Sequence, residues 1–154
     1  MVEIAITLLI IIIVASIAVP PLLKLGARGR IRSGAASVQS FLRGVRGAAV
    51  NEGITVHVRW RNGTSGPVIE ALRVNPAQTN RLTNPDWNDK DNEIIRSVML
   101  DPAFRWGSEG FFYFRSDGTA SGGELRLENK AEQSRRVEAK ATGAGIVDVE
   151  IYDE

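Results

Sequence analysis

The sequence predicts an α+β fold, with one long N-terminal helix followed by an antiparallel β domain. Three features predict it: an uninterrupted apolar run from Ile4 to Leu23, helical spacing of apolar residues between Leu22 and Gly53, and strict alternation from Ile54 onward. The chain has 154 residues, enough for about one domain with a real core.

The run from Ile4 to Leu23 contains no charged residue. A helix of this length spans about 30 Å, the hydrocarbon thickness of a bilayer. A buried core helix is one alternative, but a domain of this size rarely covers a helix that is apolar on every face. A cleaved signal peptide is another, but it would begin with basic residues, whereas this chain begins Met1-Val2-Glu3. We therefore expect a transmembrane helix with Glu3 at its mouth.

The pair Pro20-Pro21 is expected to interrupt this helix, because each Pro lacks an N–H donor and disfavours helix before it. We expect a bend near Pro20 and a loss of helical regularity between Pro20 and Gly29. The predicted organisation is a hydrophobic transmembrane or filament-core helix over residues 1–26 and a globular domain over residues 27–154. That domain comprises an amphipathic half-helix at 33–52 and β-sheets at 54–152.

The half-helix has apolar residues at steps of three and four, so one face should pack on the sheet. The side chains expected in the core are Val38, Phe41, Leu42 and Val45. Arg43 and Arg46 should point outward, and Gly53 should cap the C-terminus.

After Gly53 the apolar period changes to two, which is typical of half-buried strands. The expected strands are Ile54–Arg61, Pro67–Val74, Glu93–Leu100, Phe111–Phe114, Gly123–Leu127, Arg136–Ala141 and Ile146–Tyr152. Asn62-Gly63 is a hairpin-type turn signal. The polar stretch from Asn75 to Asn92 is expected to be a long loop.

The stretch from Met1-Val2-Glu3-Ile4 to Val19-Pro20 resembles the mature N-terminus of type IV pilins and type II secretion pseudopilins. In that superfamily a Glu near the N-terminus precedes an apolar run, with a Pro 17 residues after the Glu, the spacing of Glu3 and Pro20. The family has an N-methylated residue four places before the Glu, whereas two residues precede Glu3 here. We therefore expect the mature end to lie two residues upstream, or the chain to begin at an internal Met.

The C-terminal half adds a second resemblance. The segment Phe112–Gly123 resembles the F-x-x-x-G-x-x-x-G-G hairpin of GspH/FimT-type minor pseudopilins. Val38–Trp60 resembles that family's passage from a basic helix through a Gly into a V-x-V strand, and Thr142-Gly143 before the final strand also fits. The resemblance implies the pilin fold.

The same resemblance implies a structural subunit of a type II secretion pseudopilus, a minor pseudopilin assembled through its N-terminal helix. Its expected place is the bacterial inner membrane, as a single-pass protein with a periplasmic or extracellular domain, and then the filament. The implied partners are other pilin or pseudopilin subunits, the inner-membrane assembly platform and membrane lipid. Glu3 would pair with the N-terminal amine of an adjacent subunit, and Pro20 would bend the helix.

A type IV pilus minor pilin is the alternative, including a FimT-like pilin that captures DNA for uptake. That function needs a basic patch on the globular domain. Arg135, Arg136 and Lys140 are candidates, but Glu132 and Glu138 interleave with them. The chain end is also acidic, through Asp148, Glu150, Asp153 and Glu154. Nucleic acid is therefore not an expected partner.

The chain has few of the residue types that enzyme active sites commonly use. The chain has no Cys, a net charge of +1 and a single His, His57. His57 falls at an outward-facing strand position, where we expect a surface side chain without a catalytic partner. No catalytic residue and no cofactor are predicted, and the chain is not expected to be an enzyme.

Two polar clusters have simpler explanations than a ligand site. The segment Asp86–Glu93 is rich in oxygen ligands, but Lys90 occupies a ligand position and no Gly follows for the sharp turn of a calcium loop. We expect a solvated loop without metal. Arg28, Arg30 and Arg32 should lie at headgroup height, where they would contact lipid or acidic neighbours in a filament.

Overall fold

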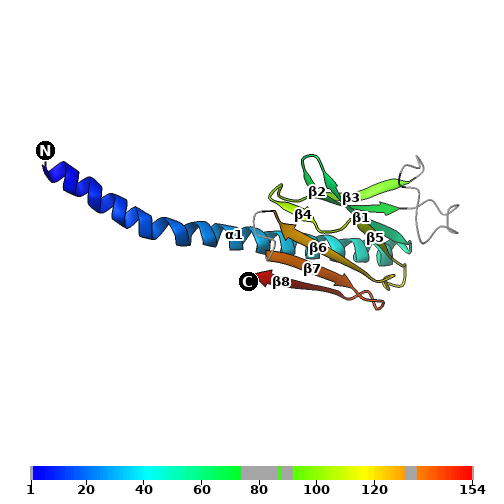
Figure 1. Cartoon of the computed structure of the whole chain (residues 1–154). Coiled ribbons are helices and arrows are strands. Elements are labelled where there is room, and N and C mark those ends of the chain that lie inside the picture. The colour runs from blue at the N-terminus through cyan, green and yellow to red at the C-terminus, as the bar shows by residue number, and fades with distance from the viewer. Residues whose placement is uncertain (1, 74–86, 88–91, 131–134, 154) are drawn as a thin grey trace.

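A computed structural model describes residues 2–73, 87, 92–130 and 135–153, with side chains for all of these except 2, 17–28, 135 and 153. One helix, α1 (Val2–Glu52), precedes strands that form two four-stranded antiparallel sheets. Figure 1 shows the first half of α1 projecting from the domain as a stem, while its second half runs along the strands. The α+β class predicted from the sequence is confirmed.

The helix is continuous through Pro20 and Pro21. The expected loss of helical regularity between Pro20 and Gly29 is therefore wrong. Each Pro removes one donor, but helix propagation is cooperative, so long flanking turns hold a short weakened stretch in helical geometry. Figure 1 shows the axis curving gently within the N-terminal half. A bend at Pro20 itself stays a prediction.

The second half of α1 buries one face against both sheets, as its spacing predicts. The buried side chains of this face are Ile31, Ala35, Val38, Phe41, Leu42, Val45 and Ala49. The helix ends at Gly53, whose φ is +65°. The Gly53 N–H donates to Val50 O at 3.3 Å, and the Ile54 N–H donates to Ala49 O at 3.1 Å. This is a Schellman cap, so the predicted role of Gly53 is confirmed.

The first sheet has the strand order β3 (Glu93–Met99), β2 (Gly66–Arg73), β1 (Val56–Gly63) and β5 (Gly110–Phe114). The β1–β2 hairpin was predicted, but its turn lies two residues further along. Gly63 pairs with Gly66, so Thr64 and Ser65 form the turn and Asn62 lies within β1.

The second sheet has the strand order β4 (Phe104–Trp106), β6 (Gly123–Asn129), β7 (Arg135–Ala141) and β8 (Val147–Asp153). The short β4 was not predicted, because three residues give too little alternation to recognise. The strands that were predicted differ from the observed bounds by at most two residues. The expected loop at Asn75–Asn92 lies outside the described residues, apart from Trp87 and Asn92.

The glycines of the hairpin motif have structural roles. Gly118 and Gly122 each have a φ of +81°, which turns the chain between β5 and β6. A Cβ on Gly123 would lie 2.8 Å from Phe112 Cδ1, so β6 can approach the core aromatic only without a side chain there. The ring centroids of Phe112 and Phe114 are 5.3 Å apart at the centre of this packing.

Candidate assembly interface

The N-terminal half of α1 exposes apolar side chains on every side. Between Ile4 and Val14 the large apolar residues are 51–65% exposed. They are Ile4, Ile6, Leu8, Leu9, Ile10, Ile11, Ile12, Ile13 and Val14. An exposed apolar surface of this extent is typical of a membrane or protein contact. Within the part of the chain whose side chains the structure describes, no helix is long and apolar enough to cross a membrane.

The hydroxyls of Thr7 and Ser16 in this half of the helix are satisfied by the helix itself. Thr7 Oγ1 donates to Glu3 O at 2.8 Å, and Ser16 Oγ donates to Ile12 O at 2.6 Å. Both bonds return one turn along the helix, so neither hydroxyl requires a partner outside it. The surface offered to a neighbour is therefore almost wholly apolar.

Glu3 lies in the first turn of α1, where a carboxylate interacts favourably with the helix dipole. Its pairing with a neighbouring amine stays a prediction. The side chain of Pro20 lies outside the described residues, as does that of Arg28. Arg30 and Arg32 are exposed near the emergence of α1 from the domain.

Arg43 is exposed as expected, but Arg46 is not free at the surface. Arg46 is half-buried, and its Nε donates to Gly118 O at 3.0 Å. The outward position predicted for Arg46 is therefore only partly right. The long Arg side chain reaches over the edge of the core and fastens the β5–β6 turn to α1.

His57 is buried rather than at the surface, with a relative exposure of 1%. It does face away from α1, as the alternation predicts, but this outer face is covered. The imidazole centroid lies 5.3 Å from that of Tyr113 and 6.4 Å from that of Trp87. Burial lowers the pKa of His57 to about 4, and Nδ1 has no hydrogen-bond partner in the described part of the chain. The ring is therefore neutral at ordinary pH and is packed among aromatic side chains.

A charged network lies beside His57 on the same face. Arg59 Nη2 lies 2.5 Å from Glu70 Oε2, and Arg61 Nη2 lies 3.3 Å from Glu70 Oε1. Burial raises the pKa of Glu70, but the hydrogen bonds and positive charges of the two arginines outweigh it and hold that pKa below its usual range. The Arg59 guanidinium also stacks 4.6 Å from the centre of the Trp87 ring. This network closes the outer face of β1.

The candidate basic patch on β7 is compensated by acids. Arg136 Nε lies 2.8 Å from Glu138 Oε1, and its guanidinium lies 4.5 Å from the Tyr152 ring centre. Tyr152 in turn donates to Glu150 Oε2 at 2.6 Å, and this bond is the main reason that the pKa of Tyr152 rises to about 12. Glu132 and the side chain of Arg135 lie outside the described residues. The described part of β7 therefore offers little positive field to a phosphate backbone.

The candidate calcium segment Asp86–Glu93 lies outside the described residues, except for Trp87, Asn92 and Glu93. Glu93 lies 3.4 Å from Arg73 in an ion pair. The described residues contain no group of three acidic or His side chains that could hold a metal ion.

Sequence reasoning missed the role of Asn62. Its Oδ1 accepts from Trp106 N at 2.8 Å, and its Nδ2 donates to Trp106 O at 3.1 Å. The side-chain amide thus substitutes for a strand neighbour and joins β1 to β4 of the other sheet. An Asn before a Gly is typical of a turn, so no local signal distinguishes this role.

No protein-family model matches the sequence, and no curated protein matches it. The fold is similar to that of the type IV minor pilin FimU of Pseudomonas aeruginosa in two crystal forms, with TM-scores of 0.54 and 0.56 at 12% and 13% identity. These matches cover 77% and 82% of this chain and 91% and 92% of FimU. The minor pseudopilin EpsH of the type 2 secretion system of Vibrio cholerae is also similar, with a TM-score of 0.55 and 16% identity over 79% of this chain and 97% of EpsH. This chain therefore has the fold of type IV pilins and pseudopilins.

Proposed function

We propose that the chain is a structural subunit of a type II secretion pseudopilus, a minor pseudopilin assembled through its N-terminal helix. One observation carries the proposal: large apolar side chains from Ile4 to Val14 are exposed all around the first half of α1, whereas the second half belongs to the core. The likeness to EpsH supports this system. The chain does not act as an enzyme.

The proposed mechanism follows from the two environments that suit an all-apolar helix. The first half is stored in the bacterial inner membrane, with the domain on the periplasmic or extracellular side. The assembly platform then moves the subunit into the filament, where the apolar surface that leaves the lipid packs against neighbouring helices. Helix association of this kind depends on packing and on satisfied polar groups. Thr7 and Ser16 meet that second requirement within their own helix.

Glu3 is proposed to set the axial position of the subunit. A carboxylate drawn into an apolar filament core is costly unless it is paired, and a neighbouring N-terminal amine would neutralise it. Only one axial register brings the two charges together, so mismatched subunits would be disfavoured.

A type IV pilus minor pilin is the second candidate, and the likeness to FimU, at a TM-score close to that of EpsH, favours it equally. Gene neighbourhood separates the two systems: secretion genes beside the coding gene favour the first, and pilus genes the second. A DNA-uptake pilin is disfavoured by the Arg136–Glu138 ion pair.

Glu3→Gln tests the assembly role. The variant should insert in the membrane normally, because Gln is no more costly there than Glu. It should fail to co-purify with partner subunits, since an unpaired buried amine costs about 3–5 kcal/mol. The measurement is co-purification beside a membrane-fraction assay. Thr7→Val, one turn along, is the matched control and should assemble. Normal assembly of Glu3→Gln would leave only the apolar anchor.

A further inference from the structure

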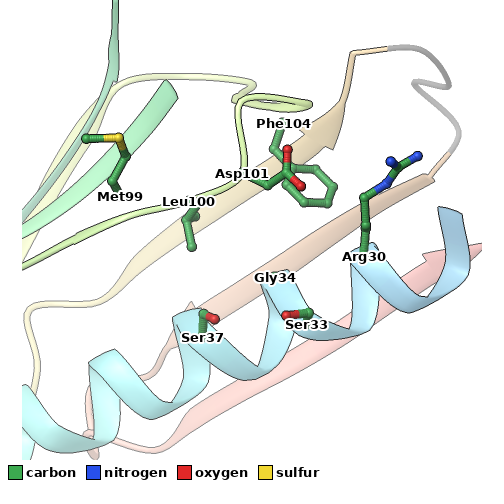
Figure 2. A pocket seen from close by; sticks show the side chains of 8 residues that line it. All are labelled: Arg30, Ser33, Gly34, Ser37, Met99, Leu100, Asp101 and Phe104. Carbon is green, nitrogen blue, oxygen red and sulfur yellow. The ribbon is translucent and has the colours of Figure 1, made fainter. Parts of the chain in front are cut away.

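A small pocket lies at the base of the stem, between α1 and the segment that leads into β4. Figure 2 shows Arg30, Ser33 and Ser37 on the helix side, with Asp101 and Phe104 on the segment opposite. Phe104 is a buried core residue, so one wall of the pocket is apolar. The cavity has a volume of about 130 Å³, which is about the volume of four water molecules in the liquid. A small polar group fits this space, whereas a helix or a strand does not.

The pocket contains one base and one acid that do not pair with each other. Within the described residues neither Arg30 nor Asp101 belongs to an ion pair, although both line the same cavity. Asp101 Oδ1 accepts from Ala103 N at 2.8 Å, and the hydroxyls of Ser33 and Ser37 make no hydrogen bond in the described part of the chain. A matching occupant therefore carries an anionic group for the helix side and a cationic donor for Asp101.

The position of the pocket along α1 is close to that expected for lipid headgroups. Arg30 follows Leu23, the last residue of the uncharged run, by seven residues, so it lies about 10 Å further along the helix axis. The headgroup layer extends about 5–8 Å beyond the hydrocarbon on each side of a bilayer, and a long Arg side chain can bridge the remaining distance. Figure 1 shows β4, which begins at Phe104, near the end of the domain from which the stem projects. The pocket therefore lies beside the membrane surface when the stem is stored in lipid.

We propose that this pocket binds the phosphoethanolamine headgroup of a membrane lipid. The phosphate accepts hydrogen bonds from Arg30 and from the two serine hydroxyls, and the primary ammonium donates to Asp101. Met99 lines the same pocket and is 60% exposed, so it offers apolar contact to the lipid beyond its headgroup. A glycerol headgroup has no cation for Asp101, and a trimethylated choline has no N–H to donate. The inference deepens the proposed function, because it rests on storage of the stem in the membrane.

Carbodiimide coupling tests the contact, because this reagent joins a carboxylate to a primary amine that touches it. The full chain is reconstituted in phosphatidylcholine vesicles that contain phosphatidylethanolamine, and peptide mass spectrometry locates the lipid amide. Asp101 should be coupled, and Arg30→Gln should reduce this coupling about tenfold. Arg32→Gln is the matched control and should couple normally. It removes the same charge two residues further along α1, where the helix has turned by about 200°.

Lipid retention measures the selectivity of the pocket. The full chain is extracted in mild detergent from vesicles with equal amounts of phosphatidylethanolamine, phosphatidylcholine and phosphatidylglycerol, and the bound lipid is quantified. The ethanolamine lipid should be enriched about tenfold over the other two. Asp101→Asn should abolish this enrichment, because the amide keeps the acceptor for Ala103 N but loses the charge. Asp117→Asn is the matched control, since Asp117 Oδ1 likewise accepts from a backbone N–H two residues later, that of Thr119, at 2.8 Å.

Three results would overturn the headgroup site. The first is an uncoupled Asp101 in a chain that floats with the vesicles, and the second is equal coupling in Arg30→Gln and Arg32→Gln. The third is coupling by soluble phosphoethanolamine, at the same concentration, as strong as that by the lipid, which would assign the pocket to a soluble zwitterion. All three leave membrane storage and the Glu3 result untouched. A chain that does not float with the vesicles contradicts the proposed function and the headgroup site together.

Discussion

The two halves of α1 differ both in how their apolar residues are arranged and in what surrounds them. Ile4 is 65% exposed, whereas Ile31, in the same helix, is 1% exposed. The second half repeats its apolar residues every three or four positions, so one face packs on the sheets and another stays polar. The first half is apolar all round, so no single sheet could cover it. An apolar segment is therefore expected to be covered, and the spacing of its apolar residues indicates whether the covering surface belongs to the same chain.

The largest expected effect comes from separating the halves. Removal of residues 1–26 should leave a folded, soluble monomer, because Ile31 is the first core side chain among those that the structure describes in α1. The intact chain should require detergent or lipid. Circular dichroism and sedimentation of both forms would measure this. An unfolded or aggregated truncated chain would mean that the stem also stabilises the domain.

A pair of leucine substitutions compares the halves directly. Leu42 is fully buried, so Leu42→Ala should lower the free energy of unfolding by about 2–5 kcal/mol. Leu9→Ala removes the same atoms from the exposed stem and should leave domain stability unchanged. Urea unfolding of both full-length variants in the same detergent gives the measurement. A loss below about 1 kcal/mol for Leu42→Ala would place that face at a subunit interface instead.

The sequence predicts the elements well because period and glycine signals are local. Leu42, Val45 and the Gly53 cap were placed correctly from spacing alone. Prediction from the sequence fails where side chains from another part of the chain cover a surface. Alternation places His57 on the outer face of β1 but cannot reveal that Tyr113 and Trp87 cover that face.

Prediction of the candidate assembly interface from the sequence has the same limit. The apolar stem could be predicted from Ile4 to Val19, because it requires only a run of residues. The pocket at its base could not, because Arg30 and Asp101 line one cavity only where the segment before β4 lies opposite α1. The role of Asn62 depends on β4, a strand too short to predict.

Acidification should lower the free energy of unfolding of the globular domain and leave the stem unaffected. The pKa of His57 is lowered from 6.5 to about 4, so the unfolded state binds a proton more readily. The contribution of neutral His57 to the free energy of unfolding is fully present above pH 6.5 and is lost as the pH falls toward 4. We expect a loss of about 2 kcal/mol between pH 7 and pH 5, from the linkage of these two pKa values. Glu70, whose pKa is also lowered, adds a loss only below its unfolded pKa of 4.5.

His57→Gln is the matched variant for this titration, because it keeps a polar side chain of similar length without a proton to gain. Urea unfolding of the chain without residues 1–26, at both pH values, provides the measurement. The variant should lose little stability where the parent loses about 2 kcal/mol. Equal losses in both proteins would assign the pH dependence to other groups.

The smallest expected effect concerns the C-terminal end of the packed half of α1. A Cβ would meet nothing within 4 Å at either Gly47 or Gly53, so packing cannot distinguish the two sites. Gly53 has a φ of +65°, in the left-handed region, and Gly53→Ala should destabilise the domain by about 1 kcal/mol. Gly47 lies within the helix, and Gly47→Ala should stabilise it by about 0.5–1 kcal/mol. Thermal unfolding of the two variants should therefore shift in opposite directions. A shift of the same sign in both would mean that backbone conformation at the cap does not determine where the helix stops.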